Sequence, residues 1–324
     1  RAATYGRGLW SSDLYDSGIN APLANFEIQG LINGCTGETL ELKDRTAYSP
    51  SAWLWTITPN TFTLMSGSKL TDKNVKLRVD STGFYSVKLR ATNANGVDSI
   101  TRLNRLVYFK KTAPSCVTTT TNGSGYGIGI AEVVFENIEN ATSKYNGTDS
   151  WSDYTCGNIA FVEPNSKYPI YVTTGTTYNQ FVEVYIDFNN DNDFADAGEK
   201  VVSTINSKGL HIDTVAIPSK GIFNTFLKMR VVSDYNTLIG NPCKNLGYGE
   251  SEEYLIYINS PEINIISSVD SLCAGTSTSF LADVTGLVDS LKWNFGNSAI
   301  PQFALVAGPH YIAFGTYAGN KTIE

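Results

Sequence analysis

Phe84-Tyr-Ser-Val-Lys-Leu-Arg-Ala91 is the stretch that decides the fold. Apolar Tyr85, Val87 and Leu89 alternate in it with polar residues, and alternation places every second side chain on the same face of an extended strand. The same period recurs along the chain, whereas helical periodicity is almost absent. The sequence therefore predicts an all-β protein. The other alternating stretches are 181–187, 226–232 and 254–258.

Turn signals separate these stretches. Asn95-Gly96, Asn122-Gly123 and Asn146-Gly147 are pairs that favour tight hairpin turns. Short strands separated by such turns are typical of β-sandwiches. The chain has 324 residues, which is more than one core usually holds. We therefore expect serial immunoglobulin-like or jelly-roll-like β-sandwiches.

Three proline-bearing polar stretches, around residues 20–22, 112–115 and 259–262, suggest the domain boundaries. They divide the chain into four parts. The first is a short tail and the last is an incomplete module, so we expect both ends to be cuts in a longer polypeptide. The parts are 1–21, 22–109, 110–259 and 260–324.

The composition is typical of a β-rich extracellular protein. Only 17% of the residues are charged, 12% are aromatic, and the net charge is −7. A surplus of acids disfavours phosphate backbones and anionic lipids as partners. No apolar run approaches the roughly 20 residues that a membrane helix needs. Nucleic-acid binding and membrane insertion are therefore not expected.

The cysteines favour disulfides over a metal site. They form no C-x-x-C pair, and no histidine lies at zinc-ligand spacing from them. We predict a disulfide between Cys156 and Cys243, with a pair between Cys116 and Cys243 as the alternative. Cys35 and Cys273 are expected to be buried apolar side chains.

Two parts of the chain are similar to each other. Gly34-Cys-Thr-Gly37 and Leu272-Cys-Ala-Gly275 are each followed by a tryptophan-bearing strand. Trp293-Asn-Phe-Gly296 resembles a strand and turn of PKD domains, which are immunoglobulin-like sandwiches of secreted bacterial proteins. Gly83 to Asn93 resembles the late strands of that family. The resemblance implies a PKD-like sandwich in the second of the four parts and a partial one in the fourth.

The segment from Cys116 to Ile258 resembles the GEVED domain of bacterial secreted proteins. Three motifs support the resemblance: Tyr185 to Asn189 with the acids that follow, Met229-Arg-Val231, and Gly249-Glu-Ser-Glu-Glu-Tyr254. The last corresponds to the motif that gives the family its name. The resemblance implies a GEVED β-sandwich in the third part of the chain.

The tail Ala3-Thr-Tyr-Gly-Arg-Gly-Leu-Trp10 resembles the closing strand of sortilin-like or neuraminidase-repeat β-propellers. This resemblance implies a propeller upstream of Arg1. The order propeller, PKD, GEVED, PKD resembles large proteins that Gram-negative bacteria export by type IX secretion. It implies an extracellular or cell-surface location, with type IX secretion components as partners.

An acidic stretch between two strand-like segments is the strongest candidate for a binding site. Asp187, Asn189, Asp191 and Asp193 offer oxygen ligands at alternate positions, and Glu199 follows about a turn later. Ca²⁺ takes about six to eight hard oxygens. Closely spaced acids repel one another unless a cation or solvent relieves them. The sequence predicts a calcium loop on a β scaffold, and the alternative is a solvated Asx-turn between two strands.

Glu250, Glu252 and Glu253 form a second acidic cluster. Alternation places Glu250 and Glu252 on one face of a strand and Glu253 on the other. In the GEVED resemblance an arginine strand joins an acidic strand, so Arg230 is the expected partner. We predict a structural pairing of these acids with Arg230, because buried acids need partners. The alternative is that they complete an ion site.

No residue pattern indicates a catalytic centre. His211 and His310 lie near no nucleophile elbow, and nothing marks two of the acids as an acid and a base. We therefore expect a non-catalytic stalk that presents or adheres to glycans or surface proteins. The alternatives are an accessory region of a secreted glycoside hydrolase or other enzyme whose catalytic propeller lies upstream, and a cargo of the type IX machinery.

Overall fold

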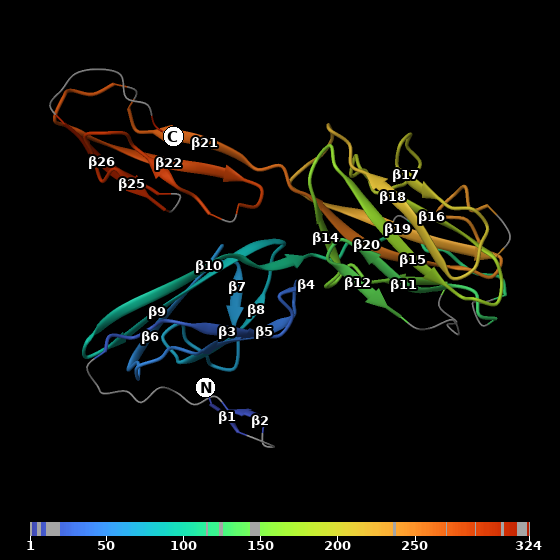
Figure 1. Cartoon of the computed structure of the whole chain (residues 1–324), viewed down its shortest axis with the longest axis horizontal. Helices are drawn as coiled ribbons and strands as arrows, with labels where there is room; N and C mark the ends of the chain where they lie inside the picture. The colour runs from blue at the N-terminus through green and yellow to red at the C-terminus, as the bar shows by residue number, and fades with distance from the viewer. Residues whose placement is uncertain are drawn as a thin grey trace. The chain divides into compact units, whose positions relative to one another are not determined.

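A computed structural model describes residues 2–4, 8–10, 20–114, 116–122, 126–142, 150–235, 238–269, 271–288, 290–305, 308–315 and 323 of the chain. These residues form strands β1 to β26 and no helix (Figure 1). The predicted all-β fold class of serial β-sandwiches is confirmed. Nothing in the described ranges is a helix of the length and apolarity that crossing a membrane requires.

The chain folds into two compact units. Unit 1 comprises Arg1–Ala113 together with Thr155–Gly157, and unit 2 comprises Pro114–Tyr154 together with Asn158–Glu324. Thr155–Gly157 therefore belong to unit 1, although their chain neighbours on both sides belong to unit 2.

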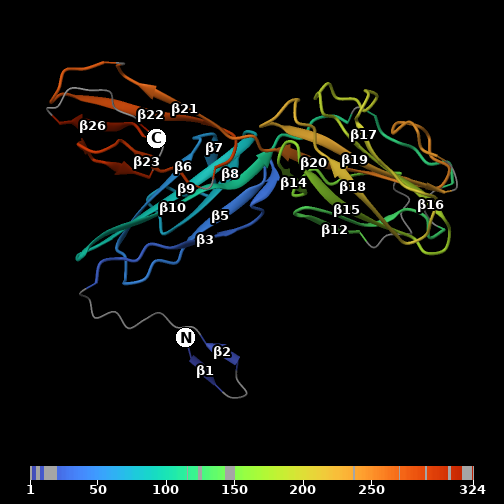
Figure 2. The same ribbon diagram turned by 45° about the horizontal axis from the view of Figure 1, so that its top comes forward.

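Unit 1 contains a short hairpin and an immunoglobulin-like sandwich of two four-stranded sheets (Figure 2). The hairpin pairs β1 (Ala2–Thr4) with β2 (Gly8–Trp10). One sheet has the order β4 (Asn33–Cys35), β10 (Gly96–Phe109), β9 (Gly83–Asn93) and β6 (Ala52–Thr58). The other sheet has the order β3 (Phe26–Gln29), β5 (Thr39–Asp44), β8 (Asn74–Val79) and β7 (Phe62–Leu64).

The alternating stretch that predicted the fold forms β9, which lies between β10 and β6. Its apolar residues Tyr85, Val87 and Leu89 are all 0% exposed, whereas Lys88 and Arg90 between them are exposed. Each fully buried apolar side chain of this size stabilises the fold by about 1.5–3 kcal/mol. The period-two pattern thus gives β9 one face in the core and one face in solvent.

Unit 2 contains a larger sandwich, the central sandwich, made from strands β11 to β20. Its small sheet has the order β12 (Ile138–Ala141), β11 (Ile130–Phe135), β15 (Lys167–Thr174) and β18 (Leu210–Ala216). Its large sheet has the order β13 (Trp151–Asp153), β20 (Glu250–Ile258), β19 (Phe226–Tyr235), β16 (Gln180–Ile186) and β17 (Lys200–Ser203), and β14 (Ile159–Val162) also pairs with β20. The two sheets share one apolar core that includes Val133, Val184, Met229 and Ile256.

The large sheet is buried on both of its faces. Every residue of β20 is buried, and so is every residue of β19 except Tyr235. One face packs against the small sheet. On the other face Tyr185 and Val232 of the sheet pack with Phe194, Ile239 and Leu246, which come from loops. Charged residues in the middle of β19 and β20 are therefore enclosed by protein.

The C-terminal module of unit 2 resembles part of the first sandwich. Its main sheet has the order β21 (Glu262–Ser267), β22 (Ser277–Thr285), β26 (His310–Phe314) and β24 (Ala299–Ile300), which repeats the order β3, β5, β8, β7. A second sheet pairs only β23 (Trp293–Asn294) with β25 (Phe303–Ala304). The residues that the structure describes beyond 260 form no counterpart of β9 and β10.

Without a counterpart of β9 and β10 among the described residues, two apolar side chains of β21 are left exposed. Ile263 and Ile265 of β21 pair with Val284 and Ala282 and share their inward face, yet they are 56% and 42% exposed. In the first sandwich Phe26 of β3 is only 1% exposed, because Trp55 of β6 and Arg102 of β10 pack against its ring. The guanidinium of Arg102 in β10 lies 4.2 Å from the centroid of that ring. The described part of the C-terminal module is thus a sandwich with one incomplete sheet.

Replacing Leu89 with alanine should destabilise unit 1 by about 2–5 kcal/mol, because it leaves a cavity at a fully buried position of β9. Urea denaturation followed by tryptophan fluorescence measures the change. The matched control is Arg90→Ala on the exposed face of the same strand, which should stay within about 0.5 kcal/mol of the parent. Equal losses from the two substitutions would contradict the burial pattern of β9.

Candidate metal site

The loop between β16 and β17 begins with a buried aspartate. Asp187 directly follows β16 and is only 1% exposed. Its Oδ1 accepts a hydrogen bond from the backbone N–H of Asp191 at 3.2 Å, and its Oδ2 accepts one from that of Asn192 at 3.0 Å. Asn190 and Asn192 have φ angles of 56° and 73°, which asparagine tolerates better than most residues. Asp187 therefore holds the first turn of the loop in place.

The next polar residues form successive Asx-turns. The backbone N–H of Asp191 donates to Asn189 Oδ1 at 3.2 Å, and that of Asp193 donates to Asp191 Oδ1 at 3.1 Å. The backbone N–H of Ala195 then donates to Asp193 Oδ1 at 2.8 Å. The loop is thus curled so that carboxylate oxygens of Asp191, Asp193 and Asp196 lie within 4.8 Å of one another.

Two of the predicted ligands, Asp191 and Asp193, are therefore brought together, and Asp196 joins them. Asp196 was not among the predicted residues, although the acidic run that continues to it was the available signal. The amide of Asn189 lies between the acids, because its Nδ2 donates to Asp191 Oδ2 at 2.9 Å and to Asp196 Oδ2 at 2.6 Å. The loop thus has both the Asx-turns of the alternative interpretation and a convergence of acids.

Glu199 closes the loop with a buried carboxylate. It is 2% exposed, and its Oε2 accepts a hydrogen bond from the backbone N–H of Asp196 at 3.2 Å. Its Oε1 is buried without a hydrogen-bond partner. Burial raises the pKa of Glu199, and the charges of Asp187, Asp196 and Asp191 raise it further. Burial likewise raises the pKa of Asp187. A bound cation would relieve the cost of ionising both groups.

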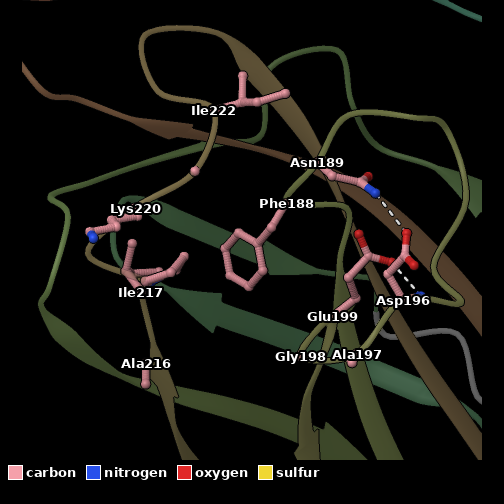
Figure 3. A pocket seen from close by; sticks show the side chains of 12 residues that line it. Phe188, Asn189, Asp196, Ala197, Gly198, Glu199, Ala216, Ile217, Lys220 and Ile222 are labelled. Atoms are coloured by element: carbon pink, nitrogen blue, oxygen red, sulfur yellow. Dashed lines mark hydrogen bonds between the residues drawn. The ribbon is translucent and has the colours of Figure 1, made fainter.

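A pocket of about 460 Å³ borders the loop. Asn189, Asp196 and Glu199 form its polar wall, and residues of the loop between β18 and β19 face them, including Ile217 and Lys220. In Figure 3 the ring of Phe188 points into the middle of this pocket, and the carboxylates of Asp196 and Glu199 lie close together at its edge. The loop 187–199, which we call the acidic loop, therefore borders an open cavity.

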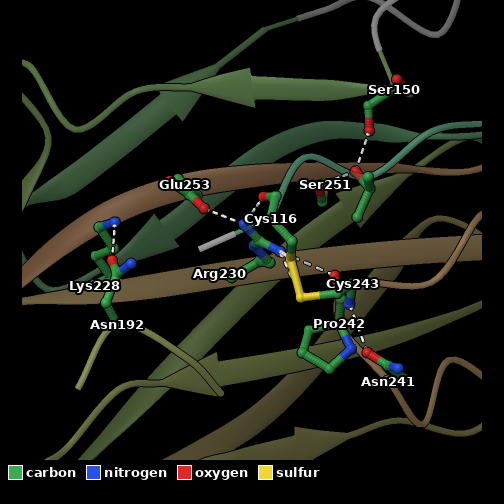
Figure 4. Close-up of polar contacts among 11 residues, drawn as sticks. Cys116, Ser150, Asn192, Lys228, Arg230, Asn241, Pro242, Cys243, Ser251 and Glu253 are labelled. Atoms are coloured by element: carbon green, nitrogen blue, oxygen red, sulfur yellow. Dashed lines mark hydrogen bonds and ion pairs between the residues drawn. A yellow bond between two sulfur atoms is a disulfide. The ribbon is translucent and has the colours of Figure 1, made fainter. Parts of the chain in front are cut away.

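Arg230 lies beneath the loops that cover the large sheet (Figure 4). It is 0% exposed and forms an ion pair with Glu253, which lies opposite it on β20. Its Nη2 also donates to the backbone oxygen of Cys116 at 2.7 Å, and its Nη1 donates to that of Pro242 at 3.0 Å. Its guanidinium lies 5.0 Å from the ring centroid of Phe194 in the acidic loop. Arg230 thus contacts both the acidic strand and the acidic loop.

Lys228 is a second buried cation on the same face of β19. It is 7% exposed, and its Nζ donates to Asn192 Oδ1 at 2.6 Å (Figure 4). Burial lowers the pKa of its ammonium group. Lys228 was not among the predicted site residues, although the alternation of β19 places Lys228 and Arg230 on one face. This contact joins the first turn of the acidic loop to the large sheet.

The three motifs at the end of β16, on β19 and on β20 thus lie side by side in one sheet. Residues 181–257 match the GEVED domain. The match covers about a quarter of the chain and all the residues of the acidic loop and of the ion pair. A GEVED domain in a chain of β-sandwiches that holds two disulfides marks a multidomain β-rich protein of extracellular type.

The comparison with solved structures gave matches at low identity and low TM-score. Titin domains A168–A170 are 11% identical with a TM-score of 0.24, covering 94% of this chain and 90% of that one. The ectodomain of mouse nectin-like molecule 4 is 10% identical with a TM-score of 0.27, covering 88% and 86%. The Yersinia pseudotuberculosis adhesin InvE is 11% identical with a TM-score of 0.22, covering 79% and 66%. The comparison with curated proteins gave no match.

The other two acids of the GEVED motif have different partners. Glu250 Oε1 accepts a hydrogen bond from the backbone N–H of Ile130 at 2.6 Å. Glu252 lies on the core face and accepts a hydrogen bond from the hydroxyl of Tyr254 at 2.6 Å, and that hydroxyl accepts one from Asn140 at 2.9 Å. Burial raises the pKa of Glu252 to about 7. Of the three predicted acids, Glu253 is therefore the one that the structure pairs with Arg230.

The predicted disulfide between Cys156 and Cys243 is wrong. Cys243 pairs with Cys116, the alternative partner, and Cys156 pairs with Cys35. Cys156 lies in the segment Thr155–Gly157, which belongs to unit 1, and Cys35 belongs to the same unit. Cys116 is held beside Cys243 because Arg230 binds the backbone of both Cys116 and Pro242.

The interpretation of Cys35 and Cys273 as buried apolar side chains is also wrong. Cys35 is buried but forms a disulfide, and Cys273 is a free, exposed thiol. The two cysteines, although at equivalent sequence positions, therefore have different roles.

Replacing Glu252 with glutamine should change the pH dependence of stability. The folded-state pKa of Glu252 is about 7, above the usual 4.5, so its contribution to stability is complete below about pH 4.5 and is lost as the pH rises through 7. Glutamine mimics the protonated acid. Compared with the parent, E252Q should be of similar stability at pH 5 and more stable by about 2–3 kcal/mol at pH 8.

Urea denaturation at the two pH values measures this difference. The control is E139Q, at an exposed acid of β12. The comparison removes the opposing effect of His211, whose pKa is lowered by burial in both proteins. An offset between E252Q and the parent that is the same at pH 5 and pH 8 would exclude a raised pKa.

Replacing Glu253 with glutamine should destabilise unit 2 by about 3–5 kcal/mol, because it removes the acid partner of a fully buried guanidinium. Replacing Arg230 and Glu253 together with leucine should cost much less than the sum of the two single losses. A double-mutant cycle by chemical denaturation measures the coupling. Additive losses would show that the two charges stabilise the domain independently.

Proposed function

We propose that this chain is a non-catalytic extracellular region that presents or adheres to other molecules, and that its GEVED domain binds Ca²⁺ through the loop 187–199. The observation that supports calcium most directly is the buried carboxylate of Glu199. Its Oε1 has no hydrogen-bond partner and lies beside an acidic cluster. A buried carboxylate oxygen without a partner is costly, and a cation is the ligand that would satisfy it.

The proposed ligands are the converging carboxylates of Asp191, Asp193 and Asp196 together with Glu199. The Nδ2 of Asn189, which donates to two of these acids, occupies the place where positive charge is favoured. Rotation of the Asn189 amide would offer its oxygen to the ion instead. Asp187 shapes the loop, because both of its oxygens accept backbone hydrogen bonds.

Calcium suits this loop better than magnesium. Ca²⁺ accepts about six to eight oxygens at flexible geometry, whereas Mg²⁺ requires a near-ideal octahedron and retains its waters. The candidate oxygens come from side chains of a curled surface loop, with Asp191, Asp193 and Asp196 exposed. A bound ion would fix this loop over the Arg230 side of the large sheet, which is how we propose that calcium stabilises the domain.

We further propose that 22–109 is a PKD-like sandwich, 110–259 the GEVED sandwich and 260–324 a partial second PKD-like sandwich. The repeated strand order of the first sandwich and the C-terminal module supports this assignment. We also propose that 1–21 ends an upstream propeller and that the protein is exported by type IX secretion. The sequence resemblances described above support these last two proposals.

Millimolar Ca²⁺ should raise the melting temperature of the chain, and terbium luminescence should report an ion bound at the loop. Stabilisation reaches about 2.7 kcal/mol at one hundred times the dissociation constant. The substitutions D191N and E199Q should abolish both signals. E199Q should be at least as stable as the parent without calcium, because Glu199 ionises reluctantly in the fold.

The matched control is D213N, which removes an exposed acid of β18 outside the loop and should keep the calcium response. The absence of any shift at millimolar Ca²⁺ would refute calcium binding. Loss of the response in D213N would show that the ion binds by general surface charge rather than at the loop.

A further inference from the structure

The pocket beside the acidic loop is a candidate site for a second ligand. We propose that it binds a saccharide in a calcium-dependent manner, with hydroxyl groups of the sugar completing the coordination of the ion. This inference rests on the proposed calcium loop and extends it to a ligand class.

The pocket and the acidic cluster share two carboxylates. Asp196 belongs to the converging acids and also lines the pocket, and the buried Glu199 with its unpartnered Oε1 lines it too. An ion held by these groups would therefore border the pocket directly (Figure 3). Because Ca²⁺ accepts about six to eight oxygens, positions are left for oxygens from outside the protein.

The remaining walls are mostly apolar. Phe188 projects its ring into the pocket, and Ile217, Pro218 and Ile222 come from the facing loop. Ile222 is 41% exposed, which leaves an apolar rim at the entrance. Lys220 also lines the pocket. An aromatic ring flanked by polar groups suits a ligand with an apolar C–H face and hydroxyls at its edge, such as a pyranose.

The local charge favours a neutral ligand over a peptide. Asp187, Asp191, Asp193, Asp196 and Glu199 lie within one loop, so a carboxylate ligand would be repelled by the acids around the ion. A lysine or arginine side chain would compete with Ca²⁺ for the same oxygens. Sugar hydroxyls avoid both penalties because they offer oxygen atoms without charge. The volume of about 460 Å³ lies within the range of small-molecule sites, about 300–1,000 Å³.

The test measures binding of the whole chain to beads that carry mannose, galactose, L-fucose or N-acetylglucosamine. At least one of these sugars should retain the chain in millimolar Ca²⁺ and release it with EDTA. The substitution I222D should weaken retention by about tenfold or more, while its calcium-dependent melting shift remains. The control is I205D at an 81% exposed position outside the pocket, which should bind as the parent does.

The outcomes separate the two proposals. A calcium-dependent melting shift without retention on any of the four sugars would refute the saccharide site and leave the calcium loop standing. Retention that EDTA does not reverse, or that I222D does not weaken, would also refute it. Capture on beads that carry a lysine-rich or glutamate-rich peptide, without capture on sugars, would identify a peptide site instead. The absence of any calcium response would overturn both proposals.

Discussion

Strands β19 and β20 are buried on both faces, and each charge on them must therefore find its partner inside the protein. Arg230 meets this requirement through Glu253 and two backbone oxygens, and Lys228 through Asn192. These partners come from a neighbouring strand and from the covering loops. The loops that cover the sheet are consequently held in place by the polar contacts of Arg230 and Lys228. The apolar contacts of Phe194, Ile239 and Leu246 hold them as well.

The same requirement connects the large sheet to the candidate metal site. Phe194, in the middle of the acidic loop, packs against Tyr185 with ring centroids 6.3 Å apart and against the guanidinium of Arg230. The loop is thereby anchored at Phe194, while Asp191, Asp193 and Asp196 remain at the surface. An anchored loop is preorganised, so less conformational entropy is lost when a ligand binds. One short loop thus contacts the interior through Phe194 and presents carboxylates at the surface.

The strands and their buried faces could largely be predicted from local sequence pattern, because apolar and polar residues alternate along strands such as β9 in step with burial. The acidic loop was equally visible, since Asp191 and Asp193 lie close in sequence and need only successive turns to converge. The pair of Cys116 and Cys243 was the alternative prediction, but the partner of Cys156 was not predictable, because it depends on the segment Thr155–Gly157 belonging to unit 1, which no local pattern marks. The burial of Lys228 was not predictable from the sequence, because it arises when a loop distant from β19 in sequence folds over the sheet.

The two disulfides interlock in sequence, since Cys116 lies between Cys35 and Cys156, and Cys156 lies between Cys116 and Cys243. If tension were applied along an unfolded chain, force would pass from residue 35 through one sulfur bridge to residue 156, back along the backbone to residue 116, and through the other bridge to residue 243. Between residues 35 and 243 only about 40 residues would then bear load, and they span at most roughly 140 Å, against roughly 700 Å for the same stretch without bridges. The two bridges therefore limit how far the unfolded stretch between residues 35 and 243 can extend.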